Sequence, residues 1–139
     1  MSPHQSKRIL CVEDDSETCE LLTNLLKPLG YNVIPASSFG DAWRSITSEQ
    51  FDLYLLDHWL PGGSGLELCR QIRAFDQHTP IVFFTGAARE SERQAALAAG
   101  AQAYLVKPGD VALLVATIER LLLHRRRRRQ RKAGYSVQQ

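Results

Sequence analysis

Short apolar runs alternate along the chain with longer segments of helical periodicity. The runs are almost continuously apolar instead of alternating with polar residues, which is typical of parallel strands that are buried on both faces. We therefore predict five strands, over residues 8–12, 31–34, 52–56, 80–84 and 103–106.

The segments between and after these runs predict five helices. The first carries leucines at helical spacing over residues 21–29, and the turn from Pro28 to Gly30 ends it. Another begins at Ser64, where Glu67 three residues later forms a capping box. The remaining helices are expected around residues 42–46, over 89–99 and over 111–122.

Five strand–helix pairs in succession predict an α/β fold with a single doubly wound, five-stranded parallel sheet flanked by five helices. Sheets of this kind bind ligands outside the carboxyl ends of their strands, at the point where the strand order reverses. The residues that follow each strand are therefore the first place to look for a site.

Polar residues follow four of the five predicted strands. The acidic turn 13–15 follows the first strand, and Asp57, Thr85 and Lys107 follow the third, fourth and fifth. Two unit charges 4 Å apart repel by about 4 kcal/mol at an effective dielectric of 20, so crowded carboxylates need a cation among them. Asp15 is expected to cap the first helix instead of joining this group.

The residue types at these strand ends favour Mg²⁺ and phosphoryl transfer. Oxygen ligands without His or Cys exclude a typical zinc site and suit Mg²⁺, which keeps several waters and phosphate oxygens as ligands. Lys107 supplies a positive charge and Thr85 a hydroxyl, which phosphoryl transfer requires around the transferred group. Asp57 is then the expected nucleophile, and its product is an aspartyl phosphate.

Four motifs at these strand ends resemble the CheY-like receiver domain of bacterial two-component response regulators. They are Ile9–Asp15, Leu55–Gly62, Phe84–Ala87 and Tyr104–Pro108, and the resemblance extends over about residues 7–123. It implies the flavodoxin-like strand order 2-1-3-4-5.

The resemblance also implies roles for the acidic residues. Glu13, Asp14 and Asp57 are expected to hold Mg²⁺, and the backbone carbonyl of Trp59 is expected to complete the protein ligands. Asp57 is expected to accept a phosphoryl group from a histidine of a sensor kinase or of a histidine phosphotransfer protein.

The resemblance implies a switch as well. Thr85 and Lys107 are expected to bind the phosphoryl oxygens, and Tyr104 is expected to swing inward as Thr85 moves. This movement changes the face made by the fourth helix, the fifth strand and the fifth helix, which is also a possible homodimer interface. The peptide bond between Lys107 and Pro108 is expected to be cis.

The amino-acid composition is typical of an ordinary intracellular domain. The 139 residues are 44% hydrophobic and 23% charged, and no apolar stretch is long enough to span a membrane. Without a secretory signal we expect a cytoplasmic protein, in which Cys11, Cys19 and Cys69 are reduced core thiols. The scattered histidines are expected at the surface; they are His4, His58, His78 and His124.

Charge divides the chain into unequal parts. Seven of the 17 Lys and Arg residues lie within 125–132, so the rest carries ten of them against 15 Asp and Glu, a net charge of −5. We expect an N-terminal tail over residues 1–6, the receiver domain over 7–123, and an Arg-rich helix extension with a disordered end over 124–139. The extension is either a solvated helix end or an arm that binds nucleic acid, acidic lipid or an acidic partner.

The expected function is a phospho-acceptor that catalyses only its own phosphorylation and dephosphorylation. A phosphatase with an Asp nucleophile would need a second Asp two residues further on, where Trp59 stands. Two other classes stay open: such a phosphatase, and a nucleic-acid-binding module that uses the Arg-rich end. A weaker variant is a receiver excised from a longer regulator or hybrid kinase.

Overall fold

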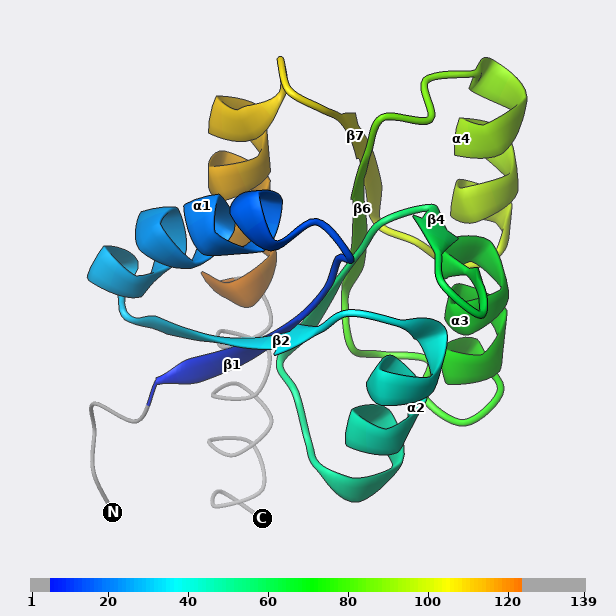
Figure 1. Ribbon diagram of the computed structural model, residues 1–139, viewed down its shortest axis with the longest axis horizontal. Helices are drawn as coiled ribbons and strands as arrows, with labels where there is room; N and C mark the ends of the chain where they lie inside the picture. Colours follow the sequence, from blue (N-terminus) through cyan, green and yellow to red (C-terminus); the bar gives the residue numbers. More distant parts are fainter. Residues whose placement is uncertain (1–5, 124–139) are drawn as a thin grey trace, which may run out of the picture.

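The computed structural model describes residues 6–123, and its centre is a parallel five-stranded sheet (Figure 1). The strand order is β2-β1-β3-β6-β7, which in chain order of these strands is the predicted order 2-1-3-4-5. The strands are β1 (Lys7–Val12), β2 (Tyr31–Ala36), β3 (Leu53–Leu56), β6 (Ile81–Thr85) and β7 (Ala103–Val106).

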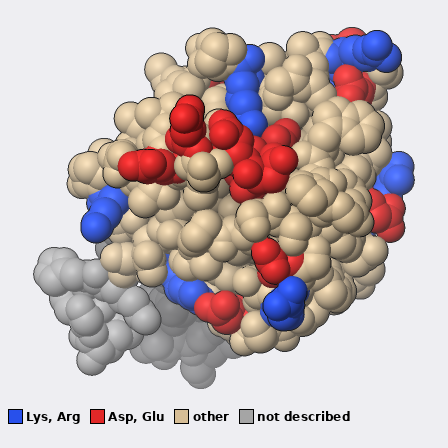
Figure 2. All heavy atoms as spheres, in the orientation of Figure 1, with Lys and Arg blue, Asp and Glu red and all other residues tan. Residues whose placement is uncertain are grey.

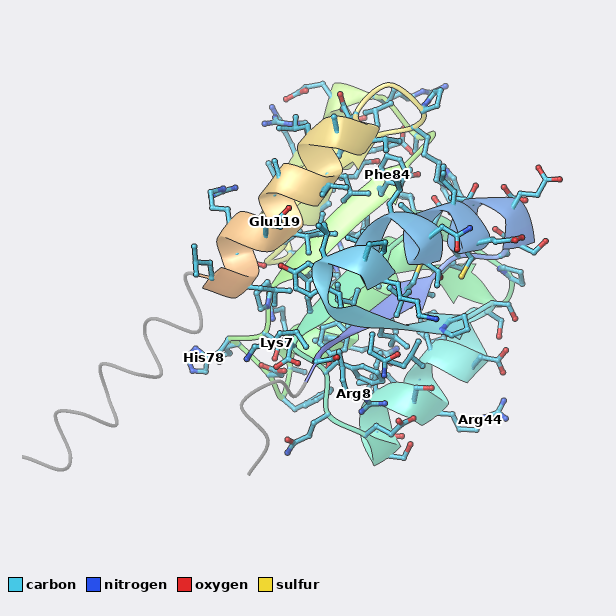
Figure 3. The ribbon with its side chains drawn as sticks, turned by 90° about the vertical axis from the view of Figure 1, so that its left-hand side faces the viewer. Lys7, Arg8, Arg44, His78, Phe84 and Glu119 are labelled. Carbon is cyan, nitrogen blue, oxygen red and sulfur yellow. The ribbon has the colours of Figure 1, made fainter. Side chains whose placement is uncertain are left out.

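Helices cover both faces of this sheet (Figures 1 and 3). On one face lie α1 (Ser16–Leu26) and the helix of residues 111–123, here called the C-terminal helix. On the other face lie α2 (Phe39–Ser48), α3 (Gly65–Arg73) and α4 (Glu90–Ala98). A short 3-10 helix, η1 (Lys27–Leu29), follows α1.

The sheet divides the hydrophobic core into two clusters, one under each layer of helices, because successive strand residues point to opposite faces of the sheet. Leu10, Val12 and Leu56 join the cluster under α2, α3 and α4. Ile9 and Leu55 join the cluster under α1 and the C-terminal helix. Every residue of β3 is buried, which explains why the strand reads as a continuous apolar run.

Side-chain caps fix where the helices begin. Asp15 accepts a hydrogen bond from the backbone N–H of Thr18, and Ser64 accepts one from that of Glu67, so both residues are N-caps as predicted. The predicted capping box is only half formed, because the Glu67 carboxylate lies with Gln71 and Arg70. Gly30 has a φ of +93°, so it closes the turn after the first helix in a conformation that favours glycine.

Two local features differ from the prediction. Strand β2 runs on to Ala36 through Pro35, which is tolerated because β2 is an edge strand. The Gly-rich segment after β3 forms a short antiparallel hairpin of β4 (Trp59–Leu60) and β5 (Gly63–Ser64). The Pro61 carbonyl of this hairpin accepts a hydrogen bond from the N–H of Phe39 at 3.0 Å, so the hairpin is fixed to the start of α2.

Some of the predictions concern the two ends of the chain, which lie outside the described residues. Residues 1–5 and 124–139 are not described, so the Arg-rich extension and the disordered end stay predictions. Among the helices within residues 6–123, none has both the length and the apolar character needed to cross a membrane.

A glycine is expected to be needed at position 65, because α3 begins there against the backbone of Asp57. A Cβ atom at this position would lie 2.0 Å from the Asp57 carbonyl oxygen and 3.0 Å from the Phe83 ring. We expect Gly65→Ala to lower the free energy of unfolding by about 3 kcal/mol, measured by urea denaturation. Gly40→Ala is the matched control: it meets nothing within 4 Å in α2 and should stabilise by about 0.5 kcal/mol. Equal stabilities of the two variants would contradict the close approach.

Candidate functional site

Three carboxylates meet at the carboxyl ends of β1 and β3. Glu13 and Asp14 follow β1, Asp57 follows β3, and one oxygen of each lies within 4.8 Å of the others. The two strands are paired with Val12 beside Leu56, so the residues that follow them come together. Figure 2 shows acidic side chains gathered near the middle of this face, with a basic side chain beside them. We call Glu13, Asp14 and Asp57 the acidic cluster.

The members of the acidic cluster differ in burial. Glu13 is 5% exposed, Asp57 is half-buried, and Asp14 is exposed. Burial raises the pKa of Glu13, and the charge of Asp57 adds to this, while hydrogen bonds from Lys107 and the Asp15 N–H oppose it. The cluster therefore has a desolvated side within the protein and an open side that faces water.

Lys107 joins two members of the acidic cluster. Its ammonium group donates hydrogen bonds to Glu13 and, at 3.2 Å, to Asp57. Burial lowers the pKa of Lys107, but the hydrogen bond to Glu13 and the charges of both carboxylates raise it further, so the net pKa lies above its ordinary value. The side chain is therefore a cation within the cluster.

The backbone places Lys107 at the end of β7. Its N–H donates to the Thr85 carbonyl at 2.9 Å, and its peptide bond to Pro108 is cis, as expected from the sequence. Thr85 ends the neighbouring strand β6 and is buried, and its hydroxyl accepts a hydrogen bond from the N–H of Ala87 at 3.1 Å.

Tyr104 already lies inward in this structure, whereas the sequence led us to expect an inward swing on phosphorylation. Its side chain bonds to the same residue as Thr85, namely Ala87. Its hydroxyl donates to the Ala87 carbonyl at 2.6 Å, and its ring stacks on Phe83 with the centroids 5.4 Å apart. Burial, with the charges of Glu92 and Asp57, raises the pKa of Tyr104 to about 12, so the hydroxyl keeps its proton. Both predicted switch residues therefore hold the backbone of Ala87.

His58 is a residue of this site that the sequence reasoning missed. It is 4% exposed, so the predicted surface position is wrong, and neither ring nitrogen has a hydrogen-bond partner. The ring lies against Trp59, whose side chain is exposed, and near Phe83 and Tyr104. The signal was the alternation of Leu56, His58 and Leu60, since residues two apart in an extended chain share one face.

Comparison with known sequences places these residues in a family. The family model of the response regulator receiver domain matches residues 9–119. The transcriptional regulatory protein ZraR of Escherichia coli is 35% identical over 121 residues, which are 87% of this chain and 27% of ZraR. This chain spans about a quarter to a half of the length of the curated relatives that it matches.

Solved structures show the same architecture. A CheY-like response regulator receiver domain protein from Methanospirillum hungatei is 31% identical with a TM-score of 0.83, covering 88% of this chain and 98% of that one. The response regulator TrrA of Thermotoga maritima, in complex with Mg(2+)-BeF, is 30% identical with a TM-score of 0.76, covering 83% and 98%. With the sheet order and the acidic cluster, these matches confirm the resemblance seen in the motifs, and the chain belongs to the response regulator receiver domain family.

Proposed function

We propose that this chain is a phospho-acceptor of a two-component or phosphorelay system. Asp57 receives a phosphoryl group from a histidine of a sensor kinase or a histidine phosphotransfer protein. The observation that carries the proposal is the position of Lys107, which holds Asp57 and Glu13 together in the acidic cluster. The chain catalyses its own phosphorylation and dephosphorylation and no other reaction.

The acidic cluster fits Mg²⁺. Its donors are all carboxylate oxygens, and Lys107 offsets one of the three negative charges, so a divalent cation would neutralise the rest. Glu13, Asp14 and Asp57 would hold the ion, with the Trp59 carbonyl as a further ligand. The related TrrA structure in complex with Mg(2+)-BeF supports this assignment. When bound, Mg²⁺ would supply positive charge to the phosphoryl oxygens.

The remaining residues divide the chemistry between them. A carboxylate oxygen of Asp57 attacks the phosphorus, the O–P bond forms as the N–P bond of the phosphohistidine breaks, and the histidine leaves with the electron pair. Lys107 already lies beside this carboxylate, so its charge is in place as negative charge gathers on the phosphoryl oxygens. Thr85 donates its hydroxyl to the phosphoryl group.

The proposed change at the surface depends on Ala87, whose backbone is hydrogen-bonded to both Thr85 and Tyr104. When the Thr85 hydroxyl turns to the phosphoryl group, it releases the N–H of Ala87, while Tyr104 keeps the Ala87 carbonyl. Phosphorylation therefore changes the segment of residues 86–89, which leads into α4. We propose that the face of α4, β7 and the C-terminal helix then changes its affinity for a partner or a second copy of the chain.

Asp57→Ala is expected to take up no phosphate, because it lacks the acceptor oxygen. The measurement is the mass gain after incubation with acetyl phosphate and Mg²⁺, which wild type should show. Asp41→Asn, an exposed Asp that pairs with Arg44 in α2, is the control and should behave as wild type. Phosphate uptake that persists in Asp57→Ala would overturn the assignment of the acceptor.

Lys107→Ala is expected to slow phosphate uptake by about 100-fold, since the transition state loses a placed positive charge. Mg²⁺ affinity, measured by calorimetry, should be kept or raised, because two carboxylates lose a competing cation. Lys7→Ala in β1 is the control. An unchanged uptake rate would show that Lys107 does not act on the phosphoryl group.

Tyr104→Phe is expected to uncouple phosphorylation from the 86–89 segment. The variant keeps the ring but leaves the Ala87 carbonyl without its donor, which costs about 1 kcal/mol of folding stability. Phosphate uptake should be normal, but hydrogen exchange in residues 86–89 should no longer respond to it as in wild type. Tyr31→Phe, in the edge strand β2, serves as control. A wild-type exchange response in Tyr104→Phe would contradict the proposed link.

A further inference from the structure

The imidazole of His58 is buried among aromatic rings. The residue is 4% exposed, and within residues 6–123 neither of its ring nitrogens has a hydrogen-bond partner. The nearest ring is that of Trp59, with the centroids 4.7 Å apart, followed by those of Phe83 at 6.2 Å and Tyr104 at 6.4 Å. A buried nitrogen that bonds to nothing raises the free energy of the state that buries it, so a state in which water reaches this ring is favoured by comparison.

The indole of Trp59 separates the His58 ring from solvent. Phe83 and Tyr104 are buried on the core side, whereas Trp59 is 63% exposed and lies against the imidazole. Trp59 begins the β4–β5 hairpin, which forms a two-stranded sheet of its own beside the five-stranded one (Figure 1). A movement of this hairpin would therefore uncover His58 without breaking any pairing of the five-stranded sheet.

Backbone hydrogen bonds and the side chain of Leu60 hold the hairpin in place. The Pro61 carbonyl accepts from the N–H of Phe39 at 3.0 Å, and the His58 carbonyl, just before the hairpin, accepts from the N–H of Gly65 at 2.7 Å. The Leu60 side chain is buried in the core cluster under α2, α3 and α4. Because a two-stranded hairpin is marginally stable by itself, these contacts and the opposing cost at His58 decide its position.

We propose that the hairpin of residues 59–64 is a lid with two positions, and that His58 keeps the open position accessible. In the closed position, which is the one in this structure, Trp59 covers the imidazole and Leu60 lies in the core. In the open position the two backbone hydrogen bonds are broken and water reaches the His58 ring. Burial of Leu60 favours the closed lid and hydration of His58 favours the open one, so their difference sets the population of the open lid.

Opening of the lid changes the acidic cluster, because the lid begins two residues after Asp57. The N–H of His58 donates to a carboxylate oxygen of Asp57 at 2.7 Å, and the Trp59 carbonyl is the proposed further ligand of Mg²⁺. The closed lid offers both groups to the site, and the open lid withdraws the carbonyl. Mg²⁺ binding and lid closure should therefore favour each other to the same degree. This coupling rests on the proposed function, whereas the lid itself does not.

The first arm of the test measures opening by hydrogen exchange of the Phe39 and Gly65 amides in the full chain. Each is the first residue of a helix, and its N–H bonds to the lid or to the residue before it. His58→Leu should slow exchange of both by about tenfold, because the closed lid then buries no unpaired polar group. His58→Gln keeps a polar side chain, so it is the matched control and should exchange as wild type. The Tyr54 amide, bonded to the Pro80 carbonyl at 2.9 Å, reports global unfolding.

Leu60→Ala is the control in the opposite direction, since it removes a contact that favours closure and should speed exchange of both lid-bonded amides. Three outcomes overturn the lid. The first needs no variant: wild-type amides of Phe39 and Gly65 that exchange no faster than that of Tyr54. The second is equal exchange of these amides in wild type and His58→Leu. The third is a slowing in His58→Gln as large as that in His58→Leu, because the polarity of the imidazole would then not be the cause.

The second arm repeats the wild-type exchange with Mg²⁺ at about ten times its dissociation constant, which calorimetry supplies. An ion that binds only under the closed lid should slow exchange of the Phe39 and Gly65 amides by about tenfold. Exchange that bound Mg²⁺ leaves unchanged overturns the coupling. A chain that binds no Mg²⁺ in the calorimeter overturns the proposed metal site and the coupling with it, and the first arm still decides whether the lid opens.

Discussion

The ammonium group of Lys107 lies between the carboxylates of Glu13 and Asp57 at the edge of the sheet. Without this contact, a buried Glu13 beside a second negative charge would carry both a desolvation cost and a repulsion of several kcal/mol. One cation against three carboxylates is incomplete compensation, and the exposed side of the cluster is where a divalent ion can complete it. The proposal that this site holds a metal ion and a phosphoryl group is based on this imbalance of charge.

The fold produces the imbalance because parallel strands end at one edge. Glu13, Asp57, Thr85 and Lys107 follow or end strands that are adjacent in the order β1-β3-β6-β7, although 94 residues separate the first from the last. The same arrangement connects the site to a surface loop, since Thr85 and Tyr104, on the neighbouring strands β6 and β7, both bond to the backbone of one loop residue. Chemistry at the acidic cluster and the surface near α4 are therefore joined through a short segment.

The sequence predicted the sheet, its flanking helices and the residues that meet at its edge. These features depend on burial on both faces of the strands and on parallel topology, which leave a direct pattern in the order of apolar residues. Contacts set by the packing of one element on another left no such pattern. The hairpin that carries Trp59 depends on how the loop after β3 packs. The burial of His58 is different, since it did leave a signal in the alternation of Leu56, His58 and Leu60. The scattered histidines indicated a surface position for His58, which is wrong, whereas the three cysteines are free thiols as expected.

The most direct test of the central claim is the Mg²⁺ affinity of wild type compared with that of Glu13→Gln, measured by calorimetry. The substitution keeps the shape of a side chain that is 5% exposed and removes the charge that Lys107 and the ion are proposed to share. If the ion completes the charge balance of the acidic cluster, the dissociation constant for Mg²⁺ should rise by at least about tenfold. Equal affinities in the two proteins would contradict this account, because the buried carboxylate would then take no part in holding the ion.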